Sequence, residues 1–263
     1  MSAACGRGEG RRRSRGDRLL APWRSLKAAL AFLTLLPASG ASGELSGAVG
    51  WFPLVGAAIG ALAGAVRFGA EQLLGRGVAS GLAVVALVLI CGALHQDGLA
   101  DSADALGARG ERSRRLAVMR DPAIGSFGAL ALIGWSALML LSVGALAAMR
   151  ALIALTVACA LARWAALVHA LVAPPARSEG LGAALRVGRV PMLAATLSAA
   201  ALAAALCGAL RGALALVLAA TLGACGARSA RRLFGGRTGD TLGATISACE
   251  VLVCVTLLGA WRG

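Results

Sequence analysis

Long apolar segments with almost no charged side chains restrict the fold of this 263-residue chain more than any other feature. Each segment approaches the roughly 20 apolar residues that an α-helix needs to cross a bilayer. A chain in lipid must satisfy its backbone polar groups internally, which a helix does within one segment. The sequence therefore predicts an all-α, polytopic integral membrane helical bundle of about six to seven transmembrane helices, over residues 49–66, 78–96, 128–149, 151–172, 191–210, 212–227 and 244–261.

The composition agrees with a protein that is embedded in a membrane. Hydrophobic residues make up 59% of the chain and charged residues only 14%, whereas a soluble domain carries about 25% charged residues. Residues 28–263 are predicted to form a single membrane-embedded domain, which opens with a short interfacial helix that ends near Pro37. Residues 1–27 are predicted to be a basic, disordered tail.

The positions of the basic residues predict an orientation. If the N-terminus is cytoplasmic and seven spans alternate, the inner segments hold 20 of the 26 Lys and Arg residues. Such an excess is typical of cytoplasmic loops. The net charge of +14 is therefore attributed to topology, and no nucleic-acid partner is expected. None of the seven cysteines lies in a CxxC pair, so they are interpreted as small apolar residues.

Three aspartates follow the second apolar run within "ALHQDGLADSADALG". If that helix continues past Leu94, Asp97, Asp101 and Asp104 lie on one face, at i, i+4 and i+7. Two carboxylates about 6 Å apart repel by roughly 3 kcal/mol at an effective dielectric near 20. A solvated acidic helix end is the alternative, but aspartate is disfavoured at helix C-termini. The spacing therefore favours a Mg²⁺ site, since Mg²⁺ accepts carboxylates and bridges to phosphates.

Other polar positions leave two interpretations open. Arg120 beside Asp121 forms either a structural ion pair or a phosphate clamp with a metal ligand. Asp240, in the glycine-rich "RRLFGGRTGDTLGA", either caps the last helix or belongs to a phosphate-binding loop. Arg163, within a span, either contacts substrate or pairs with an interior carboxylate. Glu179 is either functional or merely solvated, and Gly125 either permits close backbone approach or packs the next helix.

The motifs "FLTLLP", "WFPLVGAAIG", "HQDGLADSADAL", "MRDPAIGSFG", "EGLG" and "GGRTGDTLGA", in this order, resemble the cobalamin synthase (adenosylcobinamide-GDP ribazoletransferase) family. The resemblance runs from about Ala28 to the end of the chain. Three positions depart from the usual residues: Leu35 replaces a commonly basic residue, Pro122 a serine and Ser247 a frequently acidic residue.

The resemblance implies a Mg²⁺-dependent enzyme of the bacterial inner membrane with its active site on the cytoplasmic side. It implies that adenosylcobinamide-GDP and α-ribazole, or its 5′-phosphate, give adenosylcobalamin, or its phosphate, and GMP. The expected partners are these substrates and the lipid bilayer, and association with further copies of the same chain is left open.

The same resemblance assigns roles to residues of this chain. Asp97, Asp101 and Asp104 are implied as metal ligands and catalytic residues, with Asp240 as a further metal ligand and Asp121 as a further catalytic residue. Substrate contacts are implied for ten positions: His95, Gly98, Arg120, Gly125, Arg163, Glu179, Gly236, Arg237, Thr238 and Gly239.

Two other functions remain alternatives at this point. A phospholipid-forming CDP-alcohol phosphotransferase would use the same metal chemistry with a lipid alcohol as acceptor. A cation transporter would place its carboxylates near the middle of the membrane rather than at its edge.

Overall fold

The computed structural model describes residues 15–36 and 45–262, and these residues fold into helices without a β-strand. Six helices are long and apolar enough to cross a membrane, which confirms the predicted fold class. In chain order the helices are α1 (Arg15–Leu33), α2 (Leu45–Ala48), the 3-10 helix η1 (Val49–Trp51), α3 (Phe52–Ile90), α4 (Leu94–Gly107), α5 (Arg112–Val118), α6 (Ser126–Ala145), α7 (Ala148–Val172), α8 (Leu181–Ala184), α9 (Arg189–Cys207), α10 (Ala209–Phe234) and α11 (Gly239–Ala260).

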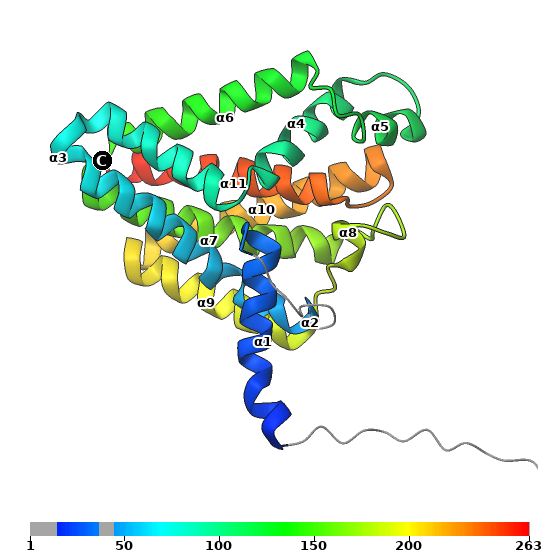
Figure 1. Cartoon of the computed structure of the whole chain (residues 1–263), viewed down its shortest axis with the longest axis horizontal. Helices are drawn as coiled ribbons and strands as arrows, with labels where there is room; N and C mark the ends of the chain where they lie inside the picture. Colours follow the sequence, from blue (N-terminus) through cyan, green and yellow to red (C-terminus); the bar gives the residue numbers. More distant parts are fainter. Residues whose placement is uncertain (1–14, 37–44, 263) are drawn as a thin grey trace, which may run out of the picture.

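Helix α3 consists of two helical arms, because the chain turns back at Gly75 (Figure 1). Gly75 has φ 73° and ψ 166°, a conformation open mainly to glycine. Arg67 in the first arm donates a hydrogen bond to the Leu146 carbonyl, while Ser80 in the second arm lies beside Gly144. The first arm covers the predicted span 49–66, and the second arm covers the predicted span 78–96 only as far as Ile90.

Helix α7 lies at the centre of the bundle, with α3, α9, α10 and α11 around it (Figure 1). Most of its side chains are buried. The first arm of α3 approaches it through glycines four residues apart: a Cβ atom on Gly56 or Gly60 would lie 2.4 or 2.1 Å from a backbone oxygen of α7. Small residues at this spacing allow close packing of membrane helices, where lipid removes the advantage of bulky side chains.

The N-terminal segment differs from its prediction. Helix α1 begins at Arg15, so residues 15–27 of the predicted disordered tail are helical, and residues 1–14 lie outside the described part of the chain. The helix is anchored at its other end, where Ala28, Ala29 and Leu33 are buried against the bundle. It ends at Leu33, and Pro37 also lies outside the described residues.

The predicted continuation of the second span past Leu94 is wrong. The second arm of α3 ends at Ile90, and a new helix, α4, begins at Leu94. Between them Gly92 and Ala93 have positive φ angles of 62° and 56°. Fifteen residues, 76–90, extend about 22 Å at 1.5 Å per residue, which is less than the roughly 30 Å of a bilayer core. Helix α4 then carries the chain to the end of the bundle where α6 and α11 begin (Figure 1).

Candidate active site

The three clustered aspartates occupy one face of α4, as their spacing predicts. The helix break changes their setting, because Asp97 now lies in the first turn of a helix, where a carboxylate is favoured. The sequence argued against a merely structural role because aspartate is disfavoured at helix C-termini. That argument does not apply to Asp97, which lies at a helix N-terminus. It holds for the later positions, and the contacts of Asp101 and Asp104 decide their roles.

Asp104 connects α4 to the start of α6. Its two carboxylate oxygens accept hydrogen bonds of 2.8 Å from the backbone N–H groups of Gly125 and Gly128. These N–H groups belong to the unpaired first turn of α6, whose N-cap, Gly125, has no side chain to satisfy them. Asp104 therefore serves as the cap for α6, and it has only its remaining lone pairs to offer a metal ion.

Gly128→Ala should lower turnover by about a hundredfold, because a Cβ atom there would lie 2.3 Å from an Asp104 oxygen and would displace the carboxylate. Gly134→Ala is the matched control, since a Cβ at this other glycine of α6 meets nothing within 4 Å. The control should be neutral or gain up to about 1 kcal/mol of stability. Rates and melting temperatures of both variants in detergent test this, and equal rates would contradict the role given to Asp104.

Helix α4 crosses α11 at very close range, which brings Asp240 to the α4 aspartates. A Cβ atom on Gly98 would lie 2.7 Å from the Asp240 carbonyl oxygen, and one on Gly243 would lie 3.2 Å from the Cα of His95. Gly98 is thus a packing residue, and the implied substrate contact at this position is replaced by contact with α11. The crossing places Asp240 among the charges that act on Asp101.

The electrostatics of Asp101 show that the carboxylates repel one another. Partial burial, followed by the charges of Asp97, Asp240 and Asp104, raises the pKa of Asp101 to about 6. Among the described residues, none of these four aspartates has a basic partner within 4 Å. Such a cluster either takes up protons or attracts a cation.

The start of α11 is a candidate anion site. Thr238 is its N-cap: the Thr238 hydroxyl accepts from the Thr241 N–H at 3.1 Å, and the Thr241 hydroxyl accepts from the Thr238 N–H at 2.9 Å. The predicted alternative that Asp240 caps this helix is wrong, since Asp240 lies inside the first turn. The first-turn N–H groups of Gly239 and Asp240 have no acceptor within the helix and favour a bound anion.

A polar cavity of about 170 Å³ lies against this helix start. Its lining includes Arg177, Glu179 and Asp240 together with residues 180–183 and 237–239. Burial, and then the neighbouring charge of Arg120, lowers the pKa of Arg177. The Arg177 guanidinium therefore lines the same cavity as Asp240, and the charge of Arg120 acts on it. Arg177 was missed by the sequence analysis, because an arginine in a polar loop carries no signal until the fold shows what it faces.

Arg237 builds the wall of this cavity. Its guanidinium donates to the carbonyl oxygens of Gly182, Ala170, Ala173 and Leu185, with distances of 2.9 Å to Gly182, 3.0 Å to Ala170 and 2.7 Å to Leu185. All three of its nitrogens are engaged by backbone. Arg237 therefore holds the end of α7 and α8 together, and the implied phosphate contact has no support from its geometry at this residue.

Arg163 has an interior role as well. It is fully buried in α7, pairs with the buried Glu250 of α11, and donates to the Cys91 sulfur at 3.2 Å. Of the two interpretations of this intramembrane arginine, the structure supports the pairing with an interior carboxylate. The implied substrate contact at Arg163 is thus not available, because the guanidinium lies between three helices.

His95 lies beneath the aspartates. Its side chain is only 3% exposed, and its Nε2 atom has no hydrogen-bond partner within the described residues. Burial, and then the charge of Arg163, hold the pKa of His95 well below its usual range, so the imidazole is neutral. His95, Asp97 and Asp240 line one narrow cavity of about 60 Å³, which leaves the imidazole available to a polar group of a substrate.

The other predicted site residues are more peripheral. Asp121 lies in the exposed loop before α6, where its carboxylate accepts from the Ala123 N–H at 3.0 Å. No direct ion pair joins it to Arg120 within the described residues. Gly236 allows the α10–α11 loop to approach the loop after α7, since a Cβ there would lie 2.3 Å from the Pro174 oxygen. Glu179 is exposed and faces the polar cavity.

The donor set fits Mg²⁺ only in part. Within the described residues no group of three or more His, Cys, Asp or Glu side chains stands close enough to form a complete metal site. Mg²⁺ is usually held by one or two carboxylates together with substrate phosphates and water. Asp97 and Asp101, with Asp240 beside them and an anion site next to them, satisfy that description.

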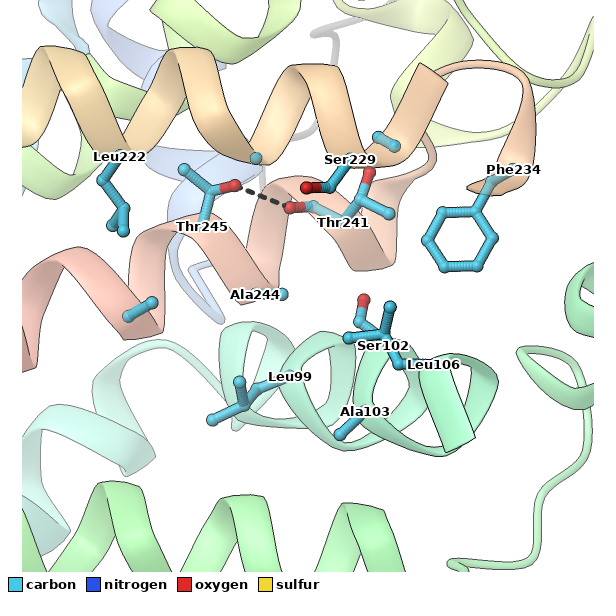
Figure 2. Close-up of a pocket in the computed structure, with 13 residues that line it drawn as sticks. Leu99, Ser102, Ala103, Leu106, Leu222, Ser229, Phe234, Thr241, Ala244 and Thr245 are labelled. Carbon is cyan, nitrogen blue, oxygen red and sulfur yellow. Dashed lines mark hydrogen bonds between the residues drawn. The ribbon is translucent and has the colours of Figure 1, made fainter. Parts of the chain in front are cut away.

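An apolar cavity of about 220 Å³ lies behind this site, between α4, α10 and α11 (Figure 2). Leu99, Ser102, Leu106 and Phe234 point into it in Figure 2. On α4 these positions project opposite to the aspartates at 100° per residue. The two faces of α4 therefore serve different surroundings, and the polar chemistry is confined to the aspartate face.

Comparison with known proteins gives one consistent family. Residues 25–258 match the family model described as cobalamin-5-phosphate synthase. The adenosylcobinamide-GDP ribazoletransferase of Herpetosiphon aurantiacus is 44% identical over 239 residues, which cover 87% of this chain and 93% of the relative. Those of Azorhizobium caulinodans and Bradyrhizobium diazoefficiens are 38% and 37% identical, and the matched residues cover 78% and 87% of this chain and 81% and 90% of the relatives. No solved structure matches.

Proposed function

The chain belongs to the cobalamin-5-phosphate synthase family, and from that premise we propose that it is an adenosylcobinamide-GDP ribazoletransferase. It would join adenosylcobinamide-GDP to α-ribazole, or to α-ribazole 5′-phosphate, and release GMP. The arrangement that supports this most directly is the meeting of Asp97, Asp101 and Asp240 beside the anion site at the start of α11. Carboxylates and anion donors on one site suit a diphosphate with its cation.

The reaction exchanges one phosphorus–oxygen bond for another. The acceptor hydroxyl attacks the phosphorus that is bonded to cobinamide, and the bond from that phosphorus to the GMP oxygen breaks. The electron pair of the broken bond leaves with GMP, and the hydroxyl loses its proton. One of the carboxylates on α4 takes this proton, because they lie beside the site where the hydroxyl must approach the phosphorus.

The residues of this chain supply position and charge. Asp97 and Asp101 would hold Mg²⁺, which when bound neutralises phosphate charge and aligns the diphosphate. The first-turn N–H groups of Gly239 and Asp240, with Arg177 and Arg120, would stabilise the charge that develops on the leaving GMP. Asp104 keeps α4 and α6 in register for this arrangement.

The site would face the cytoplasm of a bacterial inner membrane. The segments that carry the excess of basic residues meet at the same end of the bundle as the aspartates, which supports this orientation. Asp97, Asp101 and Asp104 lie in α4, which is not one of the candidate spans. No observation favours a transporter, whose ion site would lie within the spans.

A direct assay tests this function. The protein purified in detergent should release GMP when it receives adenosylcobinamide-GDP, α-ribazole and Mg²⁺, and EDTA should abolish the release. Excess Mg²⁺ should restore it, because removal of the ion leaves the diphosphate charge uncompensated. A CDP-alcohol donor supplied in parallel should be inert. Release of CMP from that donor, without GMP release from the other, would refute the assignment.

A further inference from the structure

A further cavity, of about 340 Å³, lies between α1 and the break that precedes α4. It is lined by the end of α1 and the residues just after it, by the break and by α8, through Ala28, Ala31, Phe32, Thr34, Leu35, Cys91, Gly92, Leu94 and Leu181. Leu35 packs on the break: a Cβ atom on Gly92 would lie 2.3 Å from the Leu35 side chain, and the Leu35 N–H donates to the Ile90 carbonyl at 3.1 Å.

This cavity adjoins the active site. Phe32, Leu94 and Leu181 line both the larger cavity and the narrow cavity that holds His95, Asp97 and Asp240. Leu181 and Asp240 also line the polar cavity with Arg177. A molecule in the larger cavity would therefore lie next to the cavity that His95, Asp97 and Asp240 line.

The lining of the larger cavity is mainly apolar, and its polar side-chain atoms are already engaged. The Thr34 hydroxyl donates to the Leu30 carbonyl at 2.6 Å and accepts from the Leu36 N–H at 3.2 Å. The Cys91 sulfur accepts from Arg163. Leu35, Leu94 and Leu181, at 69%, 40% and 45% exposure, surround the cavity. Among the described lining residues, no charged side chain is present.

The size and apolar lining of this cavity indicate which part of the two substrates it can hold: the corrin ring, the guanine or the base of α-ribazole. A corrin macrocycle with its side chains is too large for 340 Å³. Guanine would leave its amide and amino groups without partners in an apolar cavity, which is strongly unfavourable. The dimethylbenzimidazole base of α-ribazole is a flat, methylated bicycle with a single ring-nitrogen acceptor, and it suits apolar walls that include an aromatic ring.

We propose that this cavity is the binding site for the aromatic base of the acceptor nucleoside, with its ribose directed past His95 toward Asp97 and Asp240. The inference rests on the proposed function, because that function supplies the acceptor. Phe32, Leu35 and Leu94 determine acceptor affinity here, while donor binding depends on the polar cavity with Arg177 and the start of α11.

Two substitutions that fill the cavity test this assignment. Leu35→Trp and Ala31→Phe should each raise the KM for α-ribazole about tenfold or more, since a hydrophobic pocket discriminates by about that factor for small changes in volume. The KM for adenosylcobinamide-GDP and kcat should change less than about twofold. Leu106→Trp is the matched control: this exposed leucine lines the apolar cavity of Figure 2 on the opposite face of α4, and both KM values should remain unchanged.

Equilibrium binding of α-ribazole alone separates this inference from the proposed function. The fluorescence of its base reports binding to the detergent-solubilised protein without a donor, and Ala31→Phe should lose at least tenfold in affinity. If the wild type binds α-ribazole and Ala31→Phe does not, the base-binding role of the cavity is supported. This holds even if the wild type releases no GMP, in which case only the transferase assignment fails. Equal binding by wild type and both variants, no binding by the wild type, or a raised donor KM with an unchanged acceptor KM would overturn the inference.

Discussion

Asp101→Asn should lower turnover by about a hundredfold to a thousandfold, which is the usual loss when one group that compensates transition-state charge is removed. The same variant should melt at a higher temperature than the wild type at pH 7.5. Above a pH of about 6 the Asp101 carboxylate is ionised in the fold, against its burial and the charges of Asp97, Asp240 and Asp104, and the amide removes that repulsion. GMP release and thermal melting in the same detergent buffer measure both effects.

The pH dependence of the melting temperature tests independently whether the ionised Asp101 carboxylate destabilises the fold. Because the folded-state pKa of Asp101 lies above its ordinary value of 3.8, the wild type is destabilised at neutral pH and regains stability as the pH falls through about 6. The melting difference between wild type and Asp101→Asn should therefore shrink below pH 6. Glu111→Gln, an exposed carboxylate outside the cluster, should change neither rate nor melting temperature. A fully active Asp101→Asn protein that melts lower would refute the role given to this carboxylate.

Arg163→Met should be the most destabilising substitution in the bundle. Both side chains of the Arg163–Glu250 pair are 0% exposed, and removal of one partner of a buried pair costs about 3–5 kcal/mol, because the other charge remains buried and unpaired. The double variant Arg163→Met/Glu250→Met should recover most of this loss, since two apolar side chains leave no buried charge. Melting temperature and the yield of monodisperse protein in detergent report the effect.

Arg76 supplies the matched control for the buried pair. It bonds Glu71 at 3.2 Å, but its side chain is 56% exposed. An exposed ion pair contributes about 0–1 kcal/mol, so Arg76→Met should melt within a few degrees of the wild type. A double Arg163/Glu250 variant as unstable as the single variant would show that Arg163 matters through packing rather than through charge.

The apolar segments and the aspartate spacing could be predicted because they follow from local periodicity. Lipid requires long apolar helices, and residues at i, i+4 and i+7 share a helix face wherever the helix begins. The turn at Gly75 and the break at Gly92 and Ala93 could not be predicted in the same way. This chain has 36 glycines, and only the packed structure shows which of them adopt positive φ angles.

The roles of the arginines depended on tertiary contacts that the sequence does not contain. Arg163, Arg177 and Arg237 look alike in sequence, yet the first pairs with a carboxylate, the second faces the polar cavity and the third binds backbone carbonyls. The family resemblance indicated Arg163 and Arg237 as substrate contacts, because a motif identifies a position and not the atoms that surround it. Arg177, two residues before the recognised "EGLG" motif, needed the cavity itself to be found.

The Arg163–Glu250 pair also has a consequence for how this protein is made. The two residues lie 87 positions apart in the chain, so at about 5–20 residues per second the ribosome delivers the carboxylate roughly 4–17 seconds after the guanidinium. A central arginine in lipid costs about 2.5–3.5 kcal/mol during that interval. Membrane insertion of α7 therefore depends on the alanines and leucines around Arg163 until α11 has been synthesised. In a chain truncated before α11, Arg163 would remain unpaired and α7 would be less stable in the membrane.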